Sequence, residues 1–273
     1  MLPRERPDMR EGEKTMCEAK AKSDTADKLL RVEGLRKGEI LDQVSFEMSQ
    51  GELLAVMGPS GSGKSTLLYQ VTGMDQPSGG RVWLGGTEVT GLTEDEKARL
   101  RLKRMGFVFQ QMNMLANLNI LDNILLPAVQ ANKGKGKKSA DELTKTARDL
   151  MRKLSISGLE DRRITQVSGG QLQRACICRS MMNRPEILFA DEPTGSLNKR
   201  AASEVMTELV RLNREGTSVL MVTHDGRIAS CCDRILYLLD GRICGELVLG
   251  RAKEGTGRMR EEKVNSWLME MGW

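Results

Sequence analysis

Short apolar runs, separated by glycines and charged residues, dominate the first third of the chain. The stretches LLRVEGL (29–35), ILDQVSFEM (40–48) and RVWLGGTEV (81–89) contain β-branched residues and end at glycine or charged turns, so they predict strands. The apolar run ELLAVMG (52–58) ends in a glycine loop and passes into STLLYQVTGM (65–74). This second pattern predicts a strand, a loop and a helix in succession.

The last third of the chain alternates strand and helix patterns. EILFAD (186–191) and SVLMVTH (218–224) predict buried strands. EVMTELVRLNREG (204–216) lies between them, carries its apolar residues at helical spacing and has a stop signal at Gly216. Because strands that alternate with crossover helices are typical of a parallel sheet, we predict an α/β fold.

The remaining segments differ from these two regions. From about residue 111 to residue 180 the pattern is helical, so we expect a helical subdomain there. Residues 1–27 are charged and lack hydrophobic periodicity, which is typical of a disordered extension. The main domain is then expected at 28–250. The tail, 251–273, ends in REEKVNSWLMEMGW, which predicts an amphipathic helix that either docks on the domain or contacts a partner.

Composition narrows the class of protein. The chain has 273 residues, 39% of them hydrophobic and only 3% aromatic, so aliphatic and Met side chains must fill the core. The net charge is +5, but no basic stripe is interleaved with aromatic residues, and we expect no nucleic-acid partner. The polar N-terminus does not fit a signal peptide, and no apolar run reaches the ~18 residues of a membrane span. Taken alone, the chain is expected to be soluble.

The cysteine spacing fits neither zinc knuckles nor a secreted disulfide framework. We therefore expect the cysteines to be small buried hydrophobes in a reducing cytosol. They are Cys17, Cys176, Cys178, Cys231, Cys232 and Cys244.

A phosphate-binding pattern, G-x-x-x-x-G-K-[ST], occurs at GPSGSGKS (58–65), with the flanking strand and helix that this motif requires. Its glycines let successive backbone N–H groups turn toward an anion, Lys64 adds a charge for the β- and γ-phosphates, and the Ser65 hydroxyl can reach Mg²⁺. The alternative is a glycine turn with an incidental lysine. The expected nucleotide-binding residues are Gly58, Pro59, Ser60, Gly61, Ser62, Gly63, Lys64, Ser65 and Thr66.

Two carboxylates follow the buried strand EILFAD. Asp191 stands where the strand emerges and can hold Mg²⁺ through water, whereas Glu192 can orient or deprotonate an attacking water. Phosphoryl transfer needs little besides positioning and charge stabilisation. The alternative is a pair of surface acids that close a strand.

Two further polar residues follow apolar strand-like runs. His224, the only histidine, stands at the carboxyl end of its strand, where open α/β sheets bind their ligands, and we expect it to contact the γ-phosphate. A structural hydrogen bond is the alternative. Gln110 can bind metal or water through its amide oxygen. The expected catalytic residues are Glu192, His224 and Gln110, and the expected metal ligands are Ser65, Gln110 and Asp191.

A second glycine loop, VSGGQLQR (167–174), precedes a helix-like stretch. A glycine pair at a helix start usually serves close backbone approach or anion binding. With GPSGSGKST, Gln110, ADEPTGS and His224, this segment resembles the ATP-binding subunit of ABC transporters over roughly residues 29–248. The resemblance implies a P-loop NTPase core with a mainly parallel sheet, an antiparallel β subdomain and an inserted α-helical subdomain.

The resemblance also implies how the second loop is used. In this family two ATP-binding subunits pack head to tail, and the signature loop of one closes over the nucleotide of the other. Ser168, Gly169, Gly170 and Gln171 would therefore bind ATP held by a second copy of the chain. The implied activity is hydrolysis of ATP with Mg²⁺, coupled to a separate integral-membrane permease at the cytoplasmic face of the cell membrane.

Within the family, the chain is similar to subunits of lipoprotein-release, macrolide-export and bacitracin-resistance transporters. The similarity lies in GFVFQQMNMLANLNILDNILLP (106–127) and TGSLN (194–198). Asn198, where many relatives have Asp, and the tail ending in GW are similar to the peptide-antibiotic branch. This implies a role in antimicrobial-peptide resistance or export, with Asn198 at the nucleotide site. We expect the permease to couple near residues 110–123; ordinary subdomain core is the alternative for that apolar stretch.

One departure from the family concerns adenine. Relatives usually have an aromatic residue before the strand ILDQVSF, but no aromatic residue occurs before Phe46. Arg36 or Lys37 could replace the ring through a cation–π contact, or adenine is held loosely. Either case predicts weak discrimination among purine nucleotides.

Two other functions compete with transport. A soluble ABC-type ATPase acting on DNA or ribosomes would carry coiled-coil, zinc or paired-cassette insertions, and the sequence has none. A regulatory protein with little turnover, as suggested for division-associated relatives, is disfavoured because Glu192 and His224 are both present.

Overall fold

A computed structural model of the chain describes residues 28–133 and 138–273. The expected extension at 1–27, with Cys17, lies outside the described residues. The division of the chain at residues 27 and 250 stays a prediction.

The strands are β1 (Lys28–Lys37), β2 (Leu41–Ser49), β3 (Leu53–Met57), β4 (Gly79–Leu84), β5 (Thr87–Glu88), β6 (Met105–Val108), β7 (Ile187–Asp191), β8 (Ser218–Val222), β9 (Arg234–Leu239) and β10 (Arg242–Val248). The helices are α2 (Lys64–Val71), α3 (Glu94–Arg104), α4 (Ile120–Ala131), α5 (Ala140–Lys153), α6 (Gly169–Met181), α7 (Lys199–Arg214), α8 (Gly226–Ala229) and α9 (Gly257–Glu270), with a 3₁₀ turn, η1, at Ile164–Gln166.

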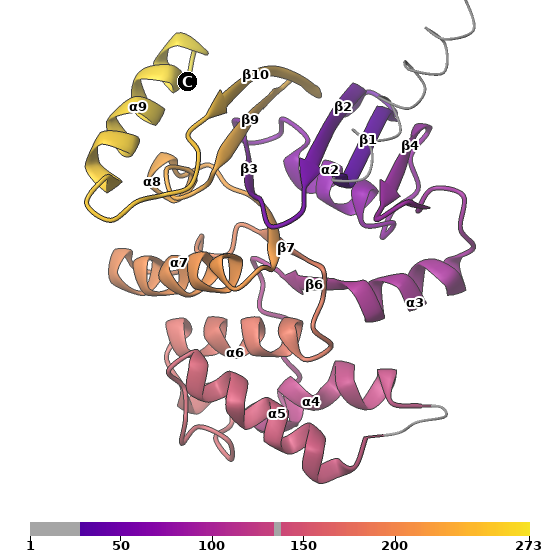
Figure 1. Cartoon of the computed structure of the whole chain (residues 1–273), viewed down its shortest axis with the longest axis vertical. Coiled ribbons are helices and arrows are strands. Elements are labelled where there is room, and N and C mark those ends of the chain that lie inside the picture. The colour runs from indigo at the N-terminus through magenta and orange to yellow at the C-terminus, as the bar shows by residue number, and fades with distance from the viewer. Residues whose placement is uncertain (1–27, 134–137) are drawn as a thin grey trace, which may run out of the picture.

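A six-stranded sheet in the order β10-β9-β3-β8-β7-β6 forms the centre of the molecule (Figure 1). All neighbours in it pair in parallel except β10 and β9, which form an antiparallel hairpin. Every residue of β3, β7 and β8 is buried. Burial on both faces explains why these strands read as continuous apolar runs in the sequence.

The other parts of the predicted fold are present as well. An antiparallel sheet, β2-β1-β4-β5, stands beside α2, and α4, α5 and α6 are inserted between β6 and β7 and lie at the opposite end of the molecule (Figure 1). The fold class predicted from the sequence is therefore confirmed.

Two hydrophobic cores lie on the two faces of the central sheet. Successive strand residues point to opposite faces, so Leu53 and Ala55 of β3 pack with the helices α4 to α7, whereas Leu54 and Val56 pack with α2 and the antiparallel sheet. This alternation places a layer of helices on one side of the sheet and the smaller sheet with α2 on the other.

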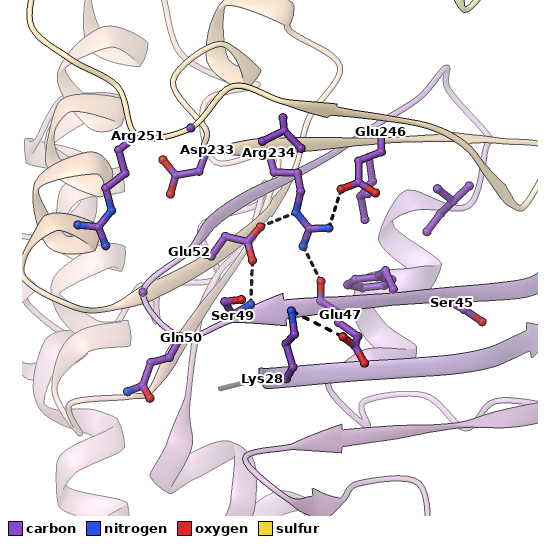
Figure 2. A pocket seen from close by; sticks show the side chains of 16 residues that line it. Lys28, Ser45, Glu47, Ser49, Gln50, Glu52, Asp233, Arg234, Glu246 and Arg251 are labelled. Carbon is purple, nitrogen blue, oxygen red and sulfur yellow. Dashed lines mark hydrogen bonds and ion pairs between the residues drawn. The ribbon is translucent and has the colours of Figure 1, made fainter. Parts of the chain in front are cut away.

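The two sheets are joined by polar contacts in a cleft of about 610 Å³ (Figure 2). The guanidinium of Arg234, from β9, donates to Glu52 at 2.6 Å and to Glu246 at 3.1 Å, and it also donates to the backbone carbonyl of Glu47 on β2. Through these three hydrogen bonds, Arg234 links the antiparallel sheet to the β9–β10 hairpin across the cleft.

The tail helix docks on the domain, as the first of its two alternatives predicts. Val264 and Leu268 of α9 are buried, and Trp267 packs edge-on against Tyr237 of β9 with ring centroids 6.1 Å apart. None of the helices within 28–133 and 138–273 combines the length and apolarity that crossing a bilayer requires.

The described cysteines are free thiols. Cys176, Cys178 and Cys232 are buried, as expected, and burial raises the pKa of Cys176 to about 11. Cys231 is half-buried. The expectation is wrong for Cys244, which is exposed because it lies on the outer face of the edge strand β10.

Candidate active site

The polar residues predicted for catalysis converge because four parallel strands end at one edge of the central sheet. In register, Val56 of β3 pairs with Val222 of β8, Val222 with Asp191 of β7, and Ala190 of β7 with Val108 of β6. The segments that follow these strands therefore emerge side by side, which is where open α/β sheets bind ligands.

The loop after β3 is wrapped around the side chain of Lys64. Lys64 is only 7% exposed, and its ammonium donates to the carbonyls of Gly58 and Pro59 at 2.8 Å each. Burial lowers the pKa of Lys64, and the nearby Glu192 and Asp191 oppose that shift. The lysine is therefore held over the loop and within the field of both carboxylates.

The glycines of this loop are required by close backbone approach. A Cβ at Gly58 would lie 2.0 Å from the carbonyl oxygen of Leu238, and one at Gly63 would lie 2.9 Å from a methyl group of Leu41. Gly61 and Gly63 also adopt positive φ values of 84° and 97°. Of the remaining loop residues, Ser60 is exposed, Ser62 is buried and Thr66 lies half-buried in the first turn of α2.

The loop leads into α2, whose hydroxyl groups reach Asp191. Ser65 Oγ donates to Asp191 Oδ1 at 2.9 Å, and the Tyr69 hydroxyl donates to Oδ2 at 3.1 Å. Asp191 is only 5% exposed. Burial and the charge of Asp191 raise the pKa of Tyr69, so its hydroxyl stays protonated and acts as a donor.

Glu192 is set apart from Asp191 by its backbone. It adopts φ of 43°, which is uncommon for a residue with a side chain and costs of order 1–3 kcal/mol. Its N–H donates to the Val222 carbonyl at 3.0 Å, which continues the pairing of β7 with β8 by one residue. One carboxylate oxygen, Oε1, lies 2.9 Å from Nδ1 of His224, whose side chain is 57% exposed. The histidine thus contacts the candidate base directly.

Gln110 approaches the same carboxylate from the end of β6. A Cβ at Gly195 would lie 3.1 Å from Glu192 Oε2 and 3.4 Å from the amide nitrogen of Gln110, so both side chains converge over Gly195. Lys64, Ser65, Asp191, Glu192, His224 and Gln110 are thereby brought to one edge of the molecule.

The signature loop lies elsewhere, at the start of α6. Ser168 caps this helix: its hydroxyl accepts from the Gln171 N–H at 3.3 Å, and the Gln171 side chain accepts from the Ser168 N–H at 2.8 Å. Ser168 and Gly169 are exposed, and Gly170 is buried against Ala201. Within residues 28–133 and 138–273 no hydrogen bond joins Ser168–Gln171 to the loop at 58–66. The helices α6 and α2 belong to the two hydrophobic cores on opposite faces of the central sheet.

Asn198 serves locally as a helix cap. Its side-chain oxygen accepts from the Ala201 N–H at 3.0 Å at the start of α7, and the residue is exposed. Because Leu197 contacts Gly169, Asn198 lies on the same surface as the signature loop. A Cβ at Gly169 would come within 3.4 Å of Leu197, an ordinary packing distance.

Neither candidate for an adenine contact is free of other partners. The Lys37 ammonium donates to Asp75 and to the Gln76 carbonyl, at 2.8 and 2.7 Å, and Arg36 lies 3.9 Å from Asp42. Ile40, 49% exposed, packs against the phosphate loop beside the buried Leu41, and its carbonyl and a methyl group approach Gly63.

Two residues of the site were missed in the sequence. Tyr69 could have been found because it stands four residues after Ser65 in a predicted helix, and such positions share one helix face. Gly195 carries no such signal, since its role depends on two side chains that meet only in the folded chain.

These groups form a set of donors for a triphosphate and a divalent cation. Lys64 and the turned N–H groups of the loop suit phosphate oxygens. One buried carboxylate and one hydroxyl suit Mg²⁺, which typically binds through one or two carboxylates together with substrate phosphates. No larger cluster of His, Cys, Asp and Glu that could hold a metal occurs in the described residues.

Comparisons with known proteins identify the family of the chain. The family model described as ABC transporter matches residues 41–195. The lipoprotein-releasing system ATP-binding protein LolD of Anaeromyxobacter dehalogenans (strain 2CP-C) is 41% identical over 208 residues, which is 76% of this chain and 85% of that protein. The bacitracin export ATP-binding protein BceA of Halalkalibacterium halodurans is 39% identical over 217 residues, 79% of this chain and 84% of that protein.

The chain spans 32% of the macrolide export ATP-binding/permease protein MacB of Bartonella henselae, at 39% identity over 217 residues. Among solved structures, it is similar to a dimeric post-hydrolysis state of the ATP-binding cassette MJ0796 bound to ADP and Pi. That likeness has a TM-score of 0.74 and 34% identity, and covers 82% of this chain and 100% of the other. The chain therefore belongs to the ABC transporter family, as an ATP-binding cassette that hydrolyses ATP.

Proposed function

We propose that this cassette is the motor subunit of a transporter for peptide antibiotics. Two copies would close over two molecules of Mg²⁺-ATP and drive a separate permease at the cytoplasmic face of the cell membrane. The observation that carries the proposal is the exposed, capped signature loop, which makes no hydrogen bond to the chain's own phosphate loop among the described residues.

Within one copy, Ser65, Asp191 and Gln110 would hold Mg²⁺, and bound Mg²⁺ neutralises charge on the phosphates. Lys64 binds the phosphates, and Glu192 accepts the proton of the attacking water. His224, 2.9 Å from Glu192, can orient that carboxylate and contact the γ-phosphate. The strained φ of Glu192 supports this role, since strain of this kind clusters at functional sites.

Across the dimer, the α6 N-terminus of one copy would complete the site of the other. Exposed N–H groups at a helix start attract an anion, and the glycines Gly169 and Gly170 allow close approach. Asn198 lies on the same surface and would contact the partner copy. A γ-phosphate bound between the two copies explains why one chain carries two glycine loops.

The permease would dock in a groove of about 430 Å³ beside Gln110. Its apolar lining includes Met74, Leu102, Phe107 and Phe109, and its rim carries Arg101 and Arg179. Part of the stretch expected to couple to the permease, 110–123, belongs to the core instead, because Ile120 is fully buried and Leu121 packs against that core. Leu115, 48% exposed, is the exposed large apolar residue of the 110–123 stretch and a candidate contact.

The substrate class rests on sequence similarity. The tail ending in GW and Asn198 favour the peptide-antibiotic branch, and BceA, a bacitracin export ATP-binding protein by name, covers most of the chain. LolD and MacB match at similar identity and provide the competing substrates, a lipoprotein and a macrolide.

The test is to purify the chain with the membrane protein encoded beside it and to measure ATP hydrolysis in proteoliposomes. We expect bacitracin to stimulate hydrolysis and erythromycin to have no effect. Stimulation by erythromycin alone would contradict the peptide assignment, and failure of any membrane protein to co-purify would contradict the coupling.

The docking groove has its own test. Leu102→Asp should abolish permease binding and leave hydrolysis by the isolated cassette intact. Val129→Asp is the matched control, since Val129 is 52% exposed on α4 and does not line the groove. Equal permease binding by both variants would contradict docking at this groove.

A further inference from the structure

Asp191 has two hydroxyl donors, and only one of them belongs to the phosphate-binding motif. Ser65 donates to Oδ1 at 2.9 Å, and Tyr69 donates to Oδ2 at 3.1 Å. The two donors stand four residues apart on α2, so they share the helix face that looks toward the end of β7. Each oxygen of a buried carboxylate is thus held by its own donor.

The two bonds are not equivalent. The Ser65 hydroxyl is also the group proposed to hold Mg²⁺, so it cannot be committed to Asp191 alone. Tyr69 has no such second task, and it is the other hydroxyl on Asp191 among the described residues. The χ2 angle of an aspartate has a broad, roughly two-fold distribution. A carboxylate that is held at only one oxygen would therefore rotate more freely about its Cβ–Cγ bond.

We propose that Tyr69 is a positioning residue for the divalent cation: its hydroxyl fixes Asp191 Oδ2, so that Oδ1 stays turned to Ser65 and the metal. This inference rests on the proposed Mg²⁺ site. It adds to that site a residue outside the phosphate-loop motif, on the second turn of α2. Hydrogen bonds to a charged carboxylate are among the stronger ones in proteins, and they also fix its orientation.

The test is Tyr69→Phe, which keeps the ring and removes the hydroxyl. We expect the Mg²⁺ concentration for half-maximal hydrolysis, and the Mn²⁺ dissociation constant of the ATP-bound protein measured by electron paramagnetic resonance, to rise about tenfold. Affinity for ATP in EDTA and the melting temperature should stay unchanged, because the ring and the phosphate loop are intact.

The chain offers a matched control in its only other tyrosine. Tyr237, on β9, is 2% exposed and packs against Trp267. Tyr237→Phe removes a hydroxyl from the same fold and should leave the Mn²⁺ dissociation constant unchanged.

Two results would overturn the inference. Unchanged or tighter Mn²⁺ binding in Tyr69→Phe would show that the hydroxyl does not position the carboxylate. Equal losses of Mn²⁺ affinity and of metal-free ATP affinity would show that Tyr69 only supports the fold. A wild-type protein that hydrolyses ATP equally well in EDTA would instead contradict the proposed Mg²⁺ site itself, so the two failures are distinguishable.

Discussion

The two glycine loops of this protein differ in how completely the chain surrounds them. At the phosphate loop, Lys64 is buried, Ser65 and Tyr69 bind Asp191, and His224 contacts Glu192. At the signature loop, Ser168 and Gln171 cap the helix reciprocally, and no hydrogen bond of the described residues joins them to the phosphate loop. The first loop is held in place by side chains of its own subunit, whereas the second is an exposed, capped helix start.

The difference suggests a division of labour between binding and turnover. One subunit contains the groups proposed to bind a nucleotide and to hold a metal. In the proposed dimer, the signature loop would contribute where a second copy presents a phosphate to it. Changes in the first region should therefore impair the chain's own chemistry, and changes in the second should impair hydrolysis without impairing ATP binding.

The largest effect is expected at the candidate base. Glu192→Gln keeps the size of the side chain but cannot accept a proton, and general-base catalysis typically contributes about 10²–10⁴-fold. Phosphate release at saturating ATP should fall by about a thousandfold, with ATP affinity retained. A fall of less than about tenfold would exclude Glu192 as the base.

A loss nearly as large is expected from Gly169→Asp. A carboxylate at the first position of α6 suits the helix dipole, so folding should be unharmed, but it would repel the γ-phosphate of the partner's ATP. Steady-state hydrolysis should fall by about a hundredfold or more, and equilibrium ATP binding to the isolated subunit should stay unchanged.

The control for this variant is Gly257→Asp. Gly257 is the first residue of α9, and no atom lies within 4 Å of a Cβ built on it. The Gly257→Asp variant should hydrolyse ATP at the wild-type rate. Lost ATP binding in Gly169→Asp would mean that the signature loop serves its own subunit's nucleotide.

Two serine residues that cap helices allow an effect on folding stability to be distinguished from an effect on hydrolysis. Ser139 caps α5 with Glu142 in the same way that Ser168 caps α6 with Gln171. Either serine changed to alanine should lower the free energy of unfolding by about 1 kcal/mol, measured by urea titration. Only Ser168→Ala should also slow hydrolysis, because in the proposed dimer its hydroxyl would face the partner's nucleotide. Equal hydrolysis by both variants would place the Ser168 hydroxyl outside the site.

The smallest expected effect is the difference in affinity between ATP and GTP. Lys37 is committed to Asp75, and the exposed residue beside the phosphate loop is the aliphatic Ile40. A cation–π contact at an exposed site contributes only about 0.5–1 kcal/mol, so the dissociation constants of ATP and GTP should agree within about fivefold. Competition binding measures the ratio, and a hundredfold preference for ATP would contradict weak base recognition.

Much of the fold was readable from hydrophobic pattern because β3, β7 and β8 are buried on both faces and α7 has one apolar face. The helix α3 was missed because most of its residues are charged, with Lys97 as its one buried residue. It is stabilised instead by a capping box between Thr93 and Glu96. Hydrophobic periodicity cannot detect a helix of this kind.

The hairpin β9–β10 was also missed, although a signal was present. Asp240 and Gly241 form its two-residue turn with φ of 46° and 73°, and an Asp-Gly pair between apolar runs is a strong hairpin signal. At the site, the motif residues could be named from spacing alone. The contact of Tyr69 with Asp191 joins residues 122 positions apart, so it depends on how α2 packs against β7.

The central claim, that the signature loop of one copy completes the site of the other, is tested most directly by the mass of Glu192→Gln in solution. At saturating Mg²⁺-ATP, size-exclusion chromatography with light scattering should give twice the 30.3 kDa of the chain. The double variant Glu192→Gln/Gly169→Asp should bind ATP and stay at 30.3 kDa. A monomeric Glu192→Gln, or a double variant that dimerises equally well, would contradict the account.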